Sequence, residues 1–182
     1  MTYYGPKELA SSFRTVRQNT IQIAEDIPEN QYGFQPAPGT RTVAQTLVHI
    51  AASAGVNRQL ANLTSFEGFD FGKFWAERAA EEAKPRSKAE IVQWLREAGE
   101  EHARWVETLN DDYLSQVIAF PAGAQPPTRT RFDMLLSAKE HEMHHRGQLM
   151  LVERLLGITP HLTRRQEERM AAMQQGQQAR HA

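Results

Sequence analysis

Four stretches of the sequence repeat apolar residues every three or four positions, and this spacing constrains the fold more than any other feature. The stretches run from about Pro6 to Ile27, from Val43 to Leu63, from Ser87 to Leu109 and from Thr130 to Leu156. Such spacing places apolar side chains along one stripe of an α-helix, and that stripe must pack against another element. Stretches rich in proline and glycine separate the four, which indicates loops between them.

Local signals mark where these helices begin and end. Thr42 with Gln45, and Ser87 with Glu90, form capping boxes, in which two side chains satisfy free backbone N–H groups at the start of a helix. Gly157 suits the left-handed position that commonly follows the last turn of a helix. Together these signals fix the helices closely enough to predict the architecture.

We therefore expect an all-α protein, a four-helix bundle with long crossover connections over residues 1–162, followed by a polar tail over residues 163–182. The tail is either a solvated helix or a frayed end. Between the second and third helices, a short amphipathic helix is expected with Phe71, Phe74 and Trp75 turned inward. The segment before Thr130 contains β-branched residues and then prolines, which predicts an extended connection.

Composition excludes several classes of function. The chain has 21 basic and 22 acidic residues, so no excess charge exists to attract nucleic acid or an acidic membrane. It has no cysteine, which excludes disulfides, thiolate nucleophiles and thiolate metal sites. The amino terminus lacks the pattern of a secretory signal, and no apolar run reaches the roughly 18 residues of a spanning helix. We expect a cytoplasmic protein.

The segment from Ala138 to Gly157 carries the candidate chemistry. His141 and His145 are four residues apart, so on a helix both imidazoles share one face and can reach one ion. At about 100° per residue, both fall on an apolar stripe and are predicted to point into the bundle; the stripe consists of Met134, Ala138, Leu149, Val152 and Leu156. The alternative is a pair of core histidines that hydrogen-bond to carbonyls or to Gln148.

His49 extends this pair to three. It lies between Val48 and Ile50 in the most apolar of the four helices. Taken alone, such a histidine is more often a hydrogen-bonded core residue than a metal ligand. With a facing pair it completes a three-histidine set, and three histidines with an open fourth position are typical of catalytic metal sites.

Other polar residues near this segment have weaker claims. His102 lies on the stripe of the third helix and could orient a ligand, act as a general base or serve as a fourth ligand. Its alternative role is that of a core-edge histidine bonded to a neighbour. Glu140 and Glu142 flank the ligands, and their helical positions predict solvent exposure. Arg146 is expected to make a surface or dimer contact.

Three segments resemble the DinB/YfiT-like family of metal-dependent enzymes: PAPGTRTVAQTLVHIA, SKAEIVQWLREAGEEHARWVETL and HEMHHRGQLMLVERLLG. The resemblance implies a four-helix bundle, often a homodimer, with a divalent metal, commonly zinc or nickel. In that family one histidine of the second helix and an H-x-x-x-H pair of the last long helix hold the metal. Carried over, these residues are His49, His141 and His145.

The resemblance also implies a small-molecule substrate and, in some members, a low-molecular-weight thiol as co-substrate. The expected activity is a thiol S-transferase or a hydrolase, in which the metal activates a thiol or a water molecule. A non-catalytic or stress-related bundle with a structural metal is the alternative. A third possibility is a metal-free helical protein whose histidines are satisfied by hydrogen bonds.

Overall fold

The computed structural model describes residues 4–181, and all four predicted long helices form within two residues of their expected limits. The elements are α1 (Pro6–Asp26), the short 3-10 helix η1 (Glu29–Gln31), α2 (Val43–Ala61), α3 (Phe71–Glu82), α4 (Lys88–Glu107), α5 (Asp111–Ser115), β1 (Val117–Ala119), β2 (Thr128–Thr130), α6 (Arg131–Leu155) and α7 (His161–His181).

The caps explain why the boundaries fall where they do. The hydroxyl of Thr42 accepts a hydrogen bond from the backbone N–H of Gln45 at 3.2 Å, and the Thr42 N–H in turn donates to Oε1 of the Gln45 side chain at 2.9 Å. Ser87 and Glu90 make the same reciprocal pair at the start of α4. Gly157 has a φ of +77°, a conformation that glycine adopts without a steric cost, and it ends α6.

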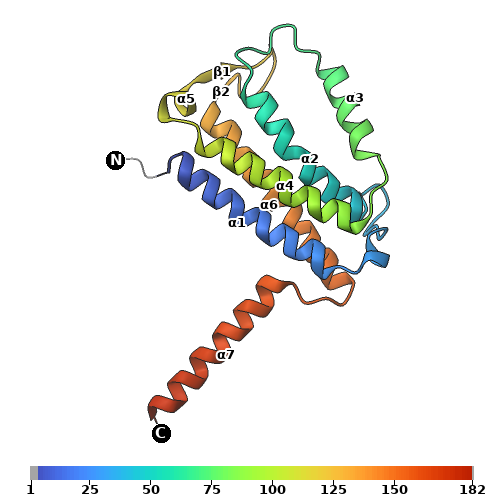
Figure 1. The fold of residues 1–182 in the computed structure, drawn as a ribbon, viewed down its shortest axis with the longest axis vertical. Helices are drawn as coiled ribbons and strands as arrows, with labels where there is room; N and C mark the ends of the chain where they lie inside the picture. Colours follow the sequence, from blue (N-terminus) through green and yellow to red (C-terminus); the bar gives the residue numbers. More distant parts are fainter. Residues whose placement is uncertain (1–3, 182) are drawn as a thin grey trace.

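The four long helices form a bundle in the spatial order α1, α4, α2, α6 (Figure 1). Helices α1 and α2 follow each other in sequence, yet each packs mainly on α4 and α6. The connection between them must therefore cross the end of the bundle, which is why it is long. The same order places α2 directly against α6.

The core consists of two apolar clusters with a polar layer between them. One cluster includes Ile23, Leu47 and Leu149, and the other includes Leu9 and Phe13. Along α1, Arg17 lies between the residues of the two clusters and is only 3% exposed. Its partner is Glu142 of α6, which is 2% exposed. The prediction that Glu142 is solvent-exposed is therefore wrong.

Helix α3 lies along α2, and a small hairpin covers the end of the bundle. Phe74 is buried as expected, but Trp75 is 51% exposed, so the prediction of an inward Trp75 is wrong. The expected extended connection forms the antiparallel strands β1 and β2, with Ile118 paired to Arg129. Ile118 packs with Phe66 in a third small cluster that joins the hairpin to the loop before α3.

Helix α7 extends away from the bundle (Figure 1). Three contacts hold its first turn: Arg164 forms an ion pair with Asp26 of α1 at 2.6 Å, His161 hydrogen-bonds to the Asn19 side chain of α1 at 3.1 Å, and Arg154 of α6 donates a hydrogen bond to the Thr163 hydroxyl at 2.9 Å. Beyond that turn the side chains described are exposed. Within residues 4–181, no helix combines the length and the apolar character that a membrane crossing requires.

Candidate metal centre

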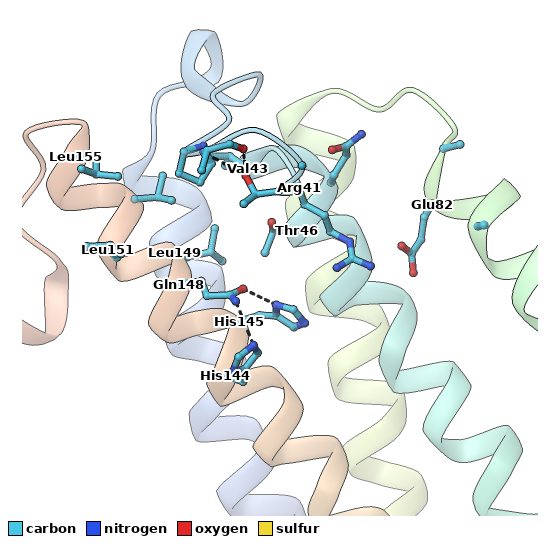
Figure 2. A pocket seen from close by; sticks show the side chains of 18 residues that line it. Arg41, Val43, Thr46, Glu82, His144, His145, Gln148, Leu149, Leu151 and Leu155 are labelled. Carbon is cyan, nitrogen blue, oxygen red and sulfur yellow. Dashed lines mark hydrogen bonds between the residues drawn. The ribbon is translucent and has the colours of Figure 1, made fainter.

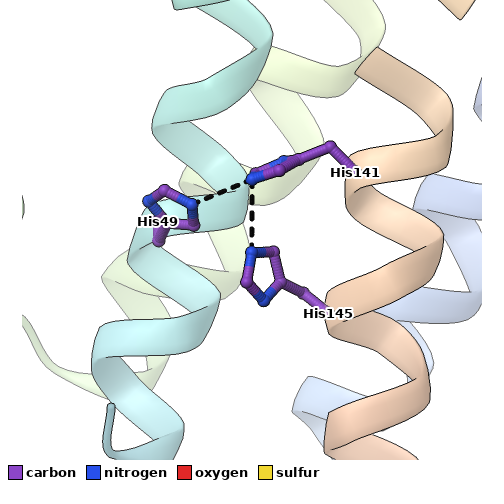
Figure 3. A group of neighbouring side chains, drawn as sticks. All are labelled: His49, His141 and His145. Atoms are coloured by element: carbon purple, nitrogen blue, oxygen red, sulfur yellow. Dashed lines mark hydrogen bonds between the residues drawn. The ribbon is translucent and has the colours of Figure 1, made fainter. Parts of the chain in front are cut away.

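His49 of α2 faces His141 and His145 of α6 across the interface of the two helices (Figure 3). The Nε2 atom of His141 lies 3.0 Å from that of His49 and 3.2 Å from that of His145. The ligand atoms of all three lie within 4.8 Å of one another. The three residues, called here the three-histidine cluster, therefore converge on a single point.

This spacing fits a transition metal. Nitrogen ligands at about 2.0–2.1 Å from a zinc ion in tetrahedral geometry lie about 3.3 Å from each other. Two contacts converge on the Nε2 atom of His141, but one imidazole N–H can satisfy only one of them well. A cation at the centre satisfies all three nitrogen atoms at once, so the donor set fits a metal better than a hydrogen-bonded cluster.

The outer ring nitrogens of two ligands are held by side chains that fix their tautomers. The Nδ1 atom of His49 donates to the Glu82 carboxylate at 2.8 Å, and that of His145 donates to the Gln148 amide oxygen at 2.8 Å. Both Nε2 atoms then carry a lone pair that points at the centre. Such partners are the usual way in which proteins orient histidine ligands.

Burial and mutual repulsion favour the neutral forms of His141 and His145. Loss of water around the ring lowers the pKa of His141 to about 4, with smaller contributions in the same direction from the neighbouring His145 and His49. The pKa of His145 is also lowered, chiefly by burial. A histidine must be deprotonated to bind a metal. At neutral pH the cluster therefore needs no proton release from these two residues.

The cluster lies at the edge of the bundle rather than in its core. His145 is buried, but His49 and His141 are only half-buried. The core-facing position that was predicted for His141 is occupied by the next residue, Glu142, while His141 turns toward α2. Both histidines of the pair thus face α2, with His145 buried and His141 half-buried at the interface of α2 and α6.

Glu142 is held by a buried ion pair that reaches all four long helices. Arg17 of α1 donates to both carboxylate oxygens of Glu142, at 2.9 and 3.0 Å. Its remaining N–H groups donate to the backbone carbonyls of Leu95 in α4, at 2.8 Å, and of Ile50 in α2, at 3.3 Å. Ile50 and Glu142 each directly follow a member of the three-histidine cluster, so this pair anchors both helices that carry it.

A pocket of about 1000 Å³ opens beside the cluster, between α6, the start of α2 and the end of α3 (Figure 2). His145 and Gln148 form part of its lining, and so does Glu82. Leucines of α6 make its wall apolar, and the loop before α2 contributes Arg41. A molecule in this pocket would lie next to a metal held by the cluster.

The other candidate histidines lie elsewhere. His102 is 3% exposed and packs on the Phe13 ring with a centroid distance of 4.6 Å, and its ring hydrogen-bonds to the Ala54 backbone. Burial lowers its pKa to about 4. It does not join the three-histidine cluster. His144 is exposed and accepts a hydrogen bond from Gln148 at 3.1 Å, outside the cluster.

Glu82 and Arg17 are the residues of this region that sequence reasoning missed. Glu82 is one of several glutamates in the sequence of α3, and nothing in the pattern separates it from Glu81, which pairs with Lys84 and Arg86 at the surface. Arg17 interrupts an apolar stripe, which is a signal, but its partner lies 125 positions away in sequence. No local pattern could have paired the two.

Comparisons with solved structures show the same fold. The DinB-like protein YjoA from Bacillus subtilis has a TM-score of 0.62 at 24% identity, over 84% of this chain and 93% of that one. YfiT from the same organism, described as a probable metal-dependent hydrolase with an unusual four-helix bundle topology, has a TM-score of 0.65 at 17% identity, over 87% and 91%. A DinB-like protein from Bacillus cereus has a TM-score of 0.64 at 20% identity, over 87% and 97%.

No curated protein matches the sequence significantly. The model of the DinB superfamily matches residues 12–149, well over half of the chain. This range contains all of α2 and α4 and most of α1 and α6, and it includes the three-histidine cluster. The resemblance found in the sequence motifs is confirmed, and the chain belongs to the DinB superfamily.

Proposed function

We propose that this protein is a metal-dependent enzyme of the hydrolase or thiol S-transferase type, with His49, His141 and His145 as the ligands of one divalent metal. The observation that carries the proposal is the convergence of three Nε2 atoms beside an open pocket. YfiT, a structural neighbour, is described as a probable metal-dependent hydrolase, which agrees with this type of activity.

Each residue around the cluster has a definite task in this proposal. Three neutral imidazoles leave the positive charge of a zinc or nickel ion intact, and such an ion lowers the pKa of a coordinated water or thiol toward neutrality. Glu82 and Gln148 hold His49 and His145 in the tautomers that bind metal. Leucines of α6 form the apolar side of the pocket.

A catalytic metal is favoured over a structural one. Structural zinc sites have four protein ligands, whereas catalytic sites have three and an open position. Among the described residues, the cluster has no fourth histidine, aspartate or glutamate. The pocket gives a small substrate, and in the transferase case a low-molecular-weight thiol, access to the remaining position.

The test is elemental analysis of the protein purified without a histidine tag, together with the His141→Ala variant. We expect close to one zinc or nickel ion per chain in the wild type and almost none in the variant. His144→Ala is the matched control, because His144 lies on the same helix and contacts Gln148 but is not a ligand. A wild-type protein that carries no metal and takes none up on titration would overturn the proposal.

A metal-loaded protein is then assayed with two panels of substrates. Chromogenic esters and amides test hydrolysis, and electrophiles offered with low-molecular-weight thiols test transfer. Activity of the wild type in either panel that His141→Ala loses assigns the reaction type. Full metal content without activity in either panel would instead favour the alternative in which the metal joins α2 and α6 structurally.

A further inference from the structure

The pocket beside the three-histidine cluster contains one charged group without a partner. Arg41 lines the pocket, and among the described residues it forms no hydrogen bond and no ion pair. Figure 2 shows its guanidinium turned into the pocket, between Glu82 and His145. A guanidinium carries five N–H donors in a planar fork that matches a carboxylate. The donors are therefore available to a ligand.

The loop that carries Arg41 forms a turn held by side-chain hydrogen bonds, which order the backbone from which the Arg41 side chain extends. Thr40 donates its hydroxyl to the carbonyl of Ala37 at 2.7 Å, and its own carbonyl accepts from the Gln35 side chain at 2.7 Å. Gly39 has a φ of +79°, which closes the turn. Thr42 follows directly and caps α2. A preorganised backbone lowers the entropic cost of binding through Arg41.

The charges of the pocket favour an anion. The only carboxylate that lines it is that of Glu82, which is engaged by His49 at 2.8 Å. Arg41 lines the same pocket as His145, a member of the cluster. A divalent metal in the cluster would add positive charge. One free guanidinium suits a monoanion, because a phosphate dianion is generally held by several cationic or N–H donors.

The wall of the pocket opposite Arg41 is apolar and therefore suits the apolar part of a ligand. Leu151 and Leu155 of α6 line the pocket and are 59% and 58% exposed, and Leu149 and Val152 line it at greater depth. Exposed leucines next to a deep apolar wall offer surface that an apolar ligand can cover. The pocket therefore presents a cationic side and an apolar side, and His145 of the three-histidine cluster also lines it.

We propose that the substrate is a small carboxylate with an apolar chain or ring, and that Arg41 binds the carboxylate while the α6 leucines cover the apolar part. This inference rests on the proposed function, since it names the substrate class of the same site. Arg41 is assigned a role in substrate binding and specificity and none in holding the metal.

The experiment compares the binding of hexanoate, hexanamide and acetate to the full-length, metal-loaded protein by calorimetry. We expect hexanoate to bind at least about tenfold more tightly than hexanamide, which lacks the charge, and than acetate, which lacks the chain. In Arg41→Gln the preference for hexanoate over hexanamide should fall about tenfold, and Arg41→Lys should restore part of it. Arg104→Gln is the matched control, because Arg104 is 75% exposed and lies outside the pocket.

The metal itself can bind a carboxylate, so the same titrations are repeated after exhaustive chelation. A preference for hexanoate over hexanamide that depends on Arg41 both with and without metal supports the inference. A preference that Arg41→Gln leaves unchanged in both states overturns it, even if every sample holds its full complement of metal. Metal content is measured in each sample, and a wild type without metal contradicts the proposed function while the Arg41 comparison still gives its own answer.

Discussion

The substitution Gly99→Ala tests whether the buried ion pair of Arg17 and Glu142 is as tightly held as its hydrogen bonds indicate. Gly99 lies in α4, opposite Arg17. A Cβ atom on Gly99 would lie 2.6 Å from Cγ, 2.9 Å from Nη1 and 3.2 Å from Cδ of Arg17. Contacts below 3.0 Å do not occur with real Cβ atoms, so either α4 or Arg17 must move.

Arg17 has little freedom to move, and this sets the sign of the effect. Its guanidinium makes two hydrogen bonds to Glu142 and two to backbone carbonyls, and the side chain is 3% exposed. Overpacking of this kind costs about 1–3 kcal/mol, and a weakened charge-assisted hydrogen bond adds about 1.5–3 kcal/mol. Alanine gains about 1 kcal/mol over glycine in a helix. The expected net destabilisation is about 2 kcal/mol or more.

Gly147→Ala is the matched control, because Gly147 also lies inside a long helix but has nothing within 4 Å of its Cβ position. At Gly147 only the higher helix propensity of alanine over glycine acts, and it should stabilise the protein by about 0.5–1 kcal/mol. Urea unfolding at neutral pH, followed by circular dichroism, gives the free energy of unfolding of both variants. Equal stabilisation by the two substitutions would refute the argument, because Arg17 would then have room to move.

Two further outcomes are expected. Glu82→Gln should weaken zinc binding about 10- to 100-fold in a chelator competition, because it removes the carboxylate that orients His49, whereas Glu81→Gln should have no effect. Glu153 is fully buried, and burial raises its pKa from 4.5 to about 7, so the folded state retains a proton that the unfolded state loses. The contribution of Glu153 to stability should therefore fall by on the order of 3 kcal/mol as the pH rises from about 4.5 to about 7, against the rise that His102 and His141 contribute because their pKa values are lowered to about 4. The free energy of unfolding of the wild type relative to that of Glu153→Gln should fall over this pH range in urea unfolding, and a constant difference would contradict the assignment.

The sequence predicted the long helices well because their signals are local. Thr42 and Ser87 carry out their capping within three residues, and Gly157 ends α6 through its own φ. The three histidines were found for a related reason: His141 and His145 are one helical turn apart, and His49 stands out in an apolar helix. Their convergence across two helices could be inferred only as a consequence of the bundle.

The errors arise where the decisive partner is distant in sequence. A glutamate in a helix is usually solvated, since a buried carboxylate without a partner is costly, so Glu142 was assigned to the surface. Its partner Arg17 lies on another helix, and helical periodicity describes only one helix at a time. Glu82 is a similar case, because it reaches His49 only through the placement of α3 against α2.

The wrong assignment of Glu142 has a consequence for the site. His141 and Glu142 are adjacent, yet His141 is half-buried at the interface with α2 whereas Glu142 is buried in the core. Buried ion pairs contribute little net stability compared with apolar residues of similar volume, so stability alone gives no reason for placing one between two apolar clusters. Because Arg17 also binds the carbonyl of Ile50, beside His49, the pair fixes the two ligand-bearing helices relative to each other. The pair therefore couples the geometry of the three-histidine cluster to the packing of the four long helices.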